Sequence, residues 1–142
     1  MIILDTNVIS EVMAPSPSPA VSVWMDAMPA FELATTTITI AEIKYGLARL
    51  PFGRRRGRLE VQLNNLVARA FGPRIFGFDI LAADAYGELV AAREQSGRPF
   101  FGLDALIAAI ASSRGLGVAT RDVRGFEGCG LQVVNPWDAG TA

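Results

Sequence analysis

The chain has 142 residues, a net charge of −1, one cysteine and no histidine. Its length and its 51% hydrophobic content predict one globular domain, residues 1–142, with a sizeable core. Without histidine the chain has no Ser-His-Asp or Cys-His nucleophile and no His-based metal site, and the lone Cys129 excludes an internal disulfide. No apolar run reaches the ~18 residues that a membrane span needs, and the start lacks a basic signal region, so we expect a cytoplasmic protein without membrane contact.

The first predicted element is a short buried strand over residues 1–5. Its consecutive aliphatic residues indicate burial on both faces, which is typical of parallel sheets. In such sheets ligands bind beyond the carboxyl ends of the strands, and Asp5 stands at that end. Two interpretations of Asp5 remain open: a functional carboxylate, or the N-cap of a helix predicted over residues 6–13.

The next predicted helix begins at Pro19, with Ser18 as its N-cap, and ends near Met28. Apolar side chains recur along it at helical spacing, which is typical of packing against a core. The alternative is a partner-binding surface. The residues of this stripe are Val21, Trp24, Met25 and Met28.

A second strand is predicted over residues 33–37, followed by a helix over residues 40–50. Glu42 lies three residues after Thr39, which is the spacing of a capping box and offers a structural role. Residues 52–58 are predicted as a loop and helix entry, which leads into an amphipathic helix over residues 59–70. Arginines crowd this loop and either bind phosphates or solvate an exposed bend: Arg54, Arg55, Arg56 and Arg58.

Three further strands are predicted over residues 74–78, 117–120 and 131–134. Helices separate the strands throughout the chain. This alternation predicts an α/β domain with a mostly parallel five-stranded sheet.

A long helix is predicted from its N-cap Asp79 to Gly97, and an extended connector follows it over residues 97–103. The helix covers about 25 Å at ~1.5 Å per residue, and the connector can span about 23 Å. We therefore expect the connector to return the chain to the carboxyl edge of the sheet before a helix over residues 105–114. That route places Asp104 beside Asp5.

Acidic residues share this predicted edge, each directly after a strand or near the start of a helix: Asp5, Glu42, Asp104 and Asp122. Each one also has a structural interpretation as a cap or a turn residue. Together they would repel one another unless a cation neutralised them, and carboxylate oxygens favour magnesium or manganese. The ten other acids face thirteen basic residues, nearly all arginine, which indicates a mild preference for polyanions.

Motifs spread over the whole chain carry a family resemblance. They are Ile3-Leu4-Asp5-Thr6-Asn7-Val8-Ile9-Ser10, Ile38-Thr39-Ile40-Ala41-Glu42-Ile43-Lys44-Tyr45-Gly46, Gly97-Arg98-Pro99 with Leu103-Asp104-Ala105-Leu106-Ile107-Ala108-Ala109, Ala119-Thr120-Arg121-Asp122, and Val134-Asn135-Pro136-Trp137. In this order the chain resembles the PIN-domain ribonucleases of the VapC type, and the FitB branch most closely.

The resemblance implies an α/β/α sandwich with strand order 3-2-1-4-5 and Mg²⁺ or Mn²⁺ in an acidic pocket. Asp5 and Asp104 would be the primary metal ligands, and Glu42 and Asp122 would complete the catalytic pocket. Supporting residues would be Thr6, Asn7 and Thr120. The candidates for RNA backbone contacts are Arg121, Lys44, Arg54, Arg55, Arg56 and Arg58. One departure concerns Asp122, because many relatives have Asn there and an acid three residues later, where this chain has Gly125.

The activity implied is metal-dependent cleavage of single-stranded RNA by the toxin of a toxin–antitoxin pair. Its partners would be a small DNA-binding antitoxin and a second copy of the chain, with further assembly. The stripe Trp24, Met25 and Met28 would form the groove for the antitoxin's tail.

Two alternatives stay open. One is a catalytically silent module of the same fold that binds protein or RNA. The other is a phosphatase of the haloacid-dehalogenase type, which is disfavoured because its Asp-x-Asp motif would need an acid where Asn7 stands.

Overall fold

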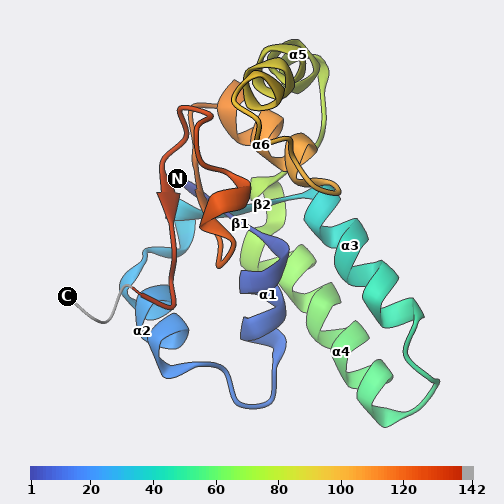
Figure 1. Ribbon diagram of the computed structural model, residues 1–142. Coiled ribbons are helices and arrows are strands. Elements are labelled where there is room, and N and C mark those ends of the chain that lie inside the picture. The colour runs from blue at the N-terminus through green and yellow to red at the C-terminus, as the bar shows by residue number, and fades with distance from the viewer. Residues whose placement is uncertain (139–142) are drawn as a thin grey trace.

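The structure, a computed structural model, describes residues 1–138 as a parallel sheet between two layers of helices. Figure 1 shows α5 and α6 on one side of the sheet and α1 to α4 on the other. The five strands lie in the order β3-β2-β1-β4-β5, and each neighbouring pair is parallel. The predicted fold class and strand order are confirmed. The strands are β1 (Ile2–Leu4), β2 (Leu33–Thr36), β3 (Ile75–Phe76), β4 (Gly117–Ala119) and β5 (Val133–Val134).

The helices follow the predicted order with shifted ends. They are α1 (Thr6–Met13), α2 (Pro19–Ala27), α3 (Thr37–Ala48), α4 (Arg54–Asn65), α5 (Ile80–Gln95) and α6 (Asp104–Ser113). Asp79 caps α5 as predicted, because its carboxylate accepts a hydrogen bond from the backbone N–H of Ala82 at 3.0 Å. Ser18 precedes α2 and Pro19 occupies its first turn as predicted, but the side chain of Ser18 makes no capping hydrogen bond. No helix within residues 1–138 is both long and apolar enough to cross a membrane.

Two predicted helix starts are wrong. The cap of α3 is Thr36, whose hydroxyl accepts from the N–H of Thr39 at 3.0 Å, so Glu42 takes no part in a capping box. The arginine run, predicted as a loop and helix entry, lies wholly in the first turns of α4, which begins at Arg54. Arg56 stabilises this start by pairing with Glu60 at 2.7 Å, one turn along the same helix.

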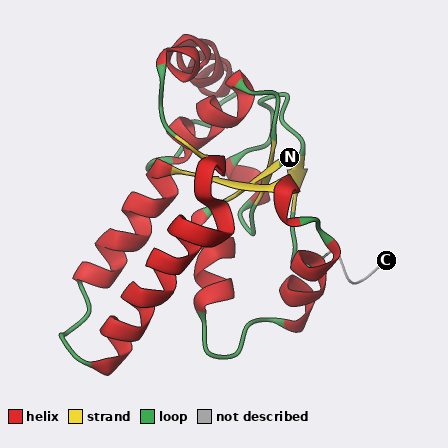
Figure 2. Ribbon diagram, turned by 180° about the vertical axis from the view of Figure 1, so that it is seen from behind, coloured by secondary structure: helices red, strands yellow, loops and turns green. Residues whose placement is uncertain are grey.

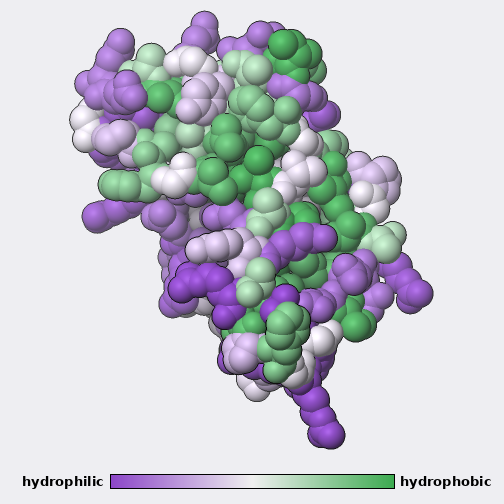
Figure 3. Space-filling model, turned by 90° about the vertical axis from the view of Figure 1, so that its right-hand side faces the viewer, coloured by the Kyte–Doolittle hydropathy of each residue, from purple (hydrophilic) through white to green (hydrophobic). Residues whose placement is uncertain are grey.

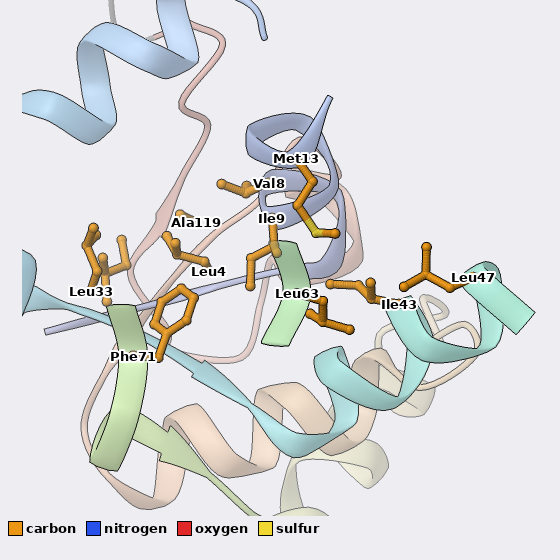
Figure 4. Packing of buried hydrophobic residues seen from close by; sticks show 11 residues of the cluster. Leu4, Val8, Ile9, Met13, Leu33, Ile43, Leu47, Leu63, Phe71 and Ala119 are labelled. Atoms are coloured by element: carbon orange, nitrogen blue, oxygen red, sulfur yellow. The ribbon is translucent and has the colours of Figure 1, made fainter. Parts of the chain in front are cut away.

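Apolar side chains form one buried cluster on each face of the sheet. Figure 4 shows the cluster beneath α1, α3 and α4, where Leu4, Ile9 and Leu63 meet. The half-buried stripe Trp24, Met25 and Met28 packs against this cluster. Core packing of α2 is therefore confirmed, and a groove for a partner along this half-buried stripe stays a prediction.

The chain reaches Asp104 by another route than the one predicted. At the end of α6, Arg114 Nη2 lies 3.0 Å from Asp79 Oδ2 at the start of α5, so the two helices run antiparallel and the connector over residues 96–103 reverses the direction of the chain. Figures 1 and 2 look nearly along α5, whereas α3 and α4 are seen from the side. Because α5 lies across the sheet, it does not carry the chain away from the carboxyl edge, and Asp104 still lies there.

Candidate active site

A cavity of about 510 Å³ opens at the carboxyl edge of the central strands. It is lined by the four predicted acids, by two of the predicted supporting residues and by further side chains: Asp5, Glu42, Asp104, Asp122, Thr6, Asn7, Ser10, Glu11, Arg121 and Trp137. We call this cavity the acidic pocket. The structure thus brings together carboxylates that are up to 117 positions apart in the sequence.

Asp5 is the most firmly held of the four acids and is only 5% exposed. Its Oδ1 accepts from the N–H of Thr6 at 2.8 Å, and its Oδ2 accepts from the hydroxyl of Thr120 at 2.8 Å. Asp5 is also the N-cap of α1, so it caps this helix and lines the acidic pocket at the same time. Burial raises the pKa of Asp5, the hydrogen bonds from Thr120 and Thr6 oppose that rise, and the charges of Glu42 and Asp122 add to it.

The buried hydroxyl of Thr120 joins the ends of β1 and β4. It accepts from Asn7 Nδ2 at 3.2 Å and from the N–H of Asp122 at 3.1 Å while donating to Asp5. Asn7 Oδ1 in turn accepts from the N–H of Arg121 at 3.1 Å. The amide of Asn7 thus links Thr120 to Arg121 through hydrogen bonds. A phosphatase of the haloacid-dehalogenase type would instead need a proton-donating acid at this position.

Glu42 reaches the pocket from α3. Its Oε1 accepts from the hydroxyl of Thr6 at 2.8 Å. This bond ties the first turn of α1 to α3 and orients one carboxylate oxygen of Glu42.

Asp104, the first residue of α6, is half-buried and forms no ion pair or side-chain hydrogen bond within residues 1–138. Burial is the main cause that raises its pKa to about 7, and the charges of Asp5, Asp122 and Glu42 raise it further, while Arg93 acts in the opposite direction. Asp104 is therefore a carboxylate whose charged form lacks a partner.

Asp122 is the turn residue that its sequence context predicts. Its Oδ1 accepts from the N–H of Gly125 at 3.3 Å and caps a short 3₁₀ turn, Val123–Gly125. A Cβ at Gly125 would lie 2.7 Å from Asp122 Oδ2 and 3.1 Å from Asp104 Oδ2. A side chain at position 125 and the carboxylate of Asp122 therefore compete for one space, which accounts physically for glycine at this position.

The acids line one pocket without forming a ready-made cage. Within residues 1–138, no three Asp, Glu or Cys side chains stand close enough together to hold one metal ion. None of the four acids belongs to the ion pairs formed in this part of the chain. Oxygen donors with uncompensated charge are the kind of ligand that hard divalent cations favour.

Of the six basic residues predicted to contact RNA, Arg121 lines the acidic pocket, with its guanidinium 5.0 Å from the centre of the Trp137 ring. Lys44 and Arg56 line a separate cavity between α3 and α4, and Arg58 lines another. Arg54 and Arg55 lie on the first turn of α4. Their contacts with RNA stay predictions.

Sequence reasoning missed Ser10, Glu11 and Trp137 as lining residues. Ser10 and Glu11 lie three and four residues after Asn7, which is the helical spacing that puts side chains on one face. Trp137 follows β5, at the same edge of the sheet as the acids. Both signals were present in the sequence.

The model of the PIN domain family matches residues 2–128. The chain is 42% identical over 138 residues to the VapC ribonuclease Y4jK of Sinorhizobium fredii, covering 97% of this chain and 99% of that protein. It is 36% identical over 137 residues to the toxin FitB of Neisseria gonorrhoeae, covering 96% of this chain and 99% of FitB. The crystal structure of FitAcB from Neisseria gonorrhoeae matches with a TM-score of 0.89 and 36% identity, covering 96% of this chain and 99% of that one.

Proposed function

The chain belongs to the PIN-domain family, and from that premise we propose that it is a metal-dependent endoribonuclease of single-stranded RNA and the toxin of a toxin–antitoxin pair. The observation that carries the enzymatic part is the acidic pocket, where four carboxylates gather without an ion-pair partner among the described residues. The ribonuclease Y4jK and the toxin FitB, which match nearly the whole chain, support the two parts of the proposal.

Mg²⁺ or Mn²⁺ would be held by Asp5 and Asp104, with Glu42 and Asp122 completing the pocket. When bound, such a cation activates water and offsets the charge of the phosphate that is cut. Thr120 and Thr6 orient Asp5 and Glu42 through hydrogen bonds of 2.8 Å each. Arg121, placed over Trp137 at the pocket, would contact the RNA backbone.

The test is RNA cleavage by Asp5→Asn and Asp104→Asn in the presence of magnesium. Both changes should lower the rate by more than about 100-fold, since even indirect supports of a metal site are worth about 10–100-fold. Asp84→Asn, an exposed acid on α5, is the matched control and should cleave normally. Cleavage at the unmodified rate by both pocket variants would show that the proposed site is wrong.

Metal titration by calorimetry separates the nuclease from a silent binding module. The unmodified protein should bind magnesium at millimolar concentration, and Asp104→Asn should bind it more weakly. No heat of binding with any divalent metal would favour the silent module.

The antitoxin would dock on an apolar cavity that adjoins the acidic pocket. This cavity of about 220 Å³ shares Thr6, Ser10 and Glu42 with the pocket. Its other lining residues come mainly from α1, α3 and α4: Met13, Ile43, Gly46, Leu47, Leu50 and Leu59. An apolar residue of a partner's tail suits this apolar lining, whereas the half-buried stripe of α2 packs against the core.

Gly46 allows a direct test of that docking, because a Cβ there meets nothing within 4 Å. Gly46→Leu should fill the cavity and abolish co-purification of the product of an adjacent small reading frame, while the protein stays folded. Gly57→Leu on α4, an equally open and exposed glycine, should retain the partner. Equal retention by the two variants would contradict docking at this cavity.

We also propose a homodimer. Figure 3 shows apolar side chains gathered across one side of the molecule. Exposed apolar residues lie at the start of α5 and just before it, namely Phe78, Ile80 and Leu81. Light scattering should give twice the chain mass for the unmodified protein and the single mass for Ile80→Glu with Leu81→Glu.

A further inference from the structure

Another cavity, of about 370 Å³, lies directly beside the acidic pocket and shares Asp122 with it. It is formed by the end of α5, the connector between α5 and α6, and the turn after β4. Its walls carry Arg98, Pro99, Phe101 and Arg124. We call it the connector cavity.

Arg93 holds the walls of the connector cavity in place. It is 3% exposed, and its guanidinium donates to the carbonyl oxygens of Arg98, Gly125 and Glu127. The same group lies 4.4 Å from the centre of the Phe100 ring. The connector and the turn after β4 are therefore joined into one built surface, and Arg93 itself is fully used in joining them.

The side chains that face solvent around this cavity have few partners. Phe101 is 78% exposed. Arg124 is exposed, and Arg98 makes one ion pair, at 3.6 Å, with Glu127, in which both side chains are about half exposed. Such a pair is weak in water, so the guanidinium of Arg98 is available to another anion.

Electrostatics decide which ligand suits the cavity. A polyanion is repelled by the acidic pocket except where a cation bridges the two, so the neighbouring phosphates of an RNA strand need positive side chains close by. Arg121 supplies one at the acidic pocket, and Arg98 and Arg124 supply two beyond Asp122. An exposed aromatic ring next to arginines is the combination that binds unpaired bases and their backbone.

We propose that the connector cavity is a nucleotide subsite for single-stranded RNA, next to the phosphodiester that the acidic pocket cuts. One base stacks on Phe101, and the phosphate beside it lies between Arg98 and Arg124. A paired base is not available for this stacking, so the subsite selects unpaired RNA. This inference rests on the proposed nuclease function.

Fluorescence anisotropy with a labelled six-nucleotide oligouridine tests the subsite without cleavage. The protein carries Asp104→Asn, which removes no hydrogen bond of the described residues. Adding Phe101→Ala should weaken binding by about 5- to 150-fold, the usual range for one stacked base. Phe31→Ala is the control, because that ring is 65% exposed in the turn Ala30–Glu32, which precedes β2 and so lies at the opposite edge of the sheet.

An abasic nucleotide moved along the oligonucleotide locates the stacked base. With Phe101 present, an abasic nucleotide at one position should lower the binding affinity about as much as Phe101→Ala does. In the Phe101→Ala protein the same abasic nucleotide should lower the affinity no further. Equal effects of Phe101→Ala and Phe31→Ala, or an abasic penalty that persists without Phe101, would overturn the subsite.

Salt dependence tests the two arginines. Arg98→Gln and Arg124→Gln should each lower the slope of log K against log salt by about 0.7, whereas Arg69→Gln, an exposed arginine outside the cavity, should leave it unchanged. Unchanged slopes for the first two variants would refute the phosphate contact. Absence of oligonucleotide binding also refutes the subsite. If Phe101→Ala instead abolishes binding of the purified protein partner, the cavity is a docking site for that partner and the subsite is refuted as well. The nuclease proposal fails separately, when the unmodified protein cuts no RNA with metal present.

Discussion

Arg93 and the acidic pocket are two charged centres that the same fold treats in opposite ways. Arg93 is 3% exposed, and its charge is met by backbone carbonyls of the chain itself. The four carboxylates include the 5% exposed Asp5, yet none has an ion-pair partner within residues 1–138. The charge of Arg93 is thus balanced by the chain itself, whereas Asp5 and Glu42 in the pocket are held by hydrogen bonds without a compensating ion pair in the described part of the chain, which is the pattern expected of a functional site.

One residue links the two centres. The carbonyl of Gly125 accepts from Arg93 at 2.9 Å, and its N–H donates to Asp122 at 3.3 Å. Arg93 therefore helps to position Asp122, one of the acids without an ion-pair partner among the described residues. Substitutions in Arg93 should therefore act mainly on stability, and substitutions in the acidic pocket mainly on activity.

The largest effect on stability is expected from Arg93→Met. Loss of the guanidinium leaves the carbonyls of Arg98, Gly125 and Glu127 without their donor, and we expect a loss of about 3 kcal/mol or more in the free energy of unfolding. Urea denaturation measures it. The exposed Arg69→Met should change stability by less than about 0.5 kcal/mol. Similar losses for the two variants would contradict a structural role for Arg93.

Thr120→Val should act on the pocket rather than on the whole fold. It keeps the shape of the side chain but removes the donor to Asp5 and the acceptor for Asn7. Metal affinity and cleavage should fall by about 10- to 100-fold. Thr120→Ser, which keeps the hydroxyl, should recover most of the activity. Activity close to that of the unmodified protein for Thr120→Val would show that Asp5 does not need this hydrogen bond.

Gly125→Ala should disturb the junction of the two centres. The new Cβ would lie 2.7 Å from Asp122 Oδ2, which we expect to cost about 1–3 kcal/mol in unfolding free energy. Adding Asp122→Ala removes the clashing oxygen, so the double variant should be more stable than the two single losses added together predict. Strict additivity in thermal unfolding would rule out the shared space.

The smallest effect is expected from pH on the metal-free protein. Asp104 has a pKa of about 7 in the folded chain against 3.8 ordinarily, so between these values the folded state holds a proton that the unfolded state has lost. The contribution of Asp104 to stability is therefore fully present below the lower value and falls as pH rises through the higher one. The melting temperature should drop between about pH 5 and about pH 8, with a smaller drop for Asp104→Asn. The same dependence of melting temperature on pH in the unmodified protein and in Asp104→Asn would contradict the raised pKa of Asp104. Adding magnesium should raise the melting temperature of the unmodified protein at the higher pH.

Much of the site could be predicted because strand ends are a local property. Asp5 and Asp122 follow buried strands, and parallel strands share one carboxyl edge. The start of α3 could not be predicted correctly because Thr36 and Thr39 are both capable caps, and only the end of β2 selects Thr36. The direction of α5 depends on which face and which neighbours it covers, and its own sequence carries no record of them.

The sequence by itself determined the alternation of strands and helices, the parallel sheet and the edge where the acids gather, because these follow from hydrophobic period, caps and turn residues within short segments. Only the tertiary structure decided which groups hold those acids. The hydroxyl of Thr120 meets Asp5 across 115 positions of sequence, and Arg93 reaches carbonyls 32 and 34 positions away. Such partners are chosen by packing of distant segments, and no local pattern specifies them.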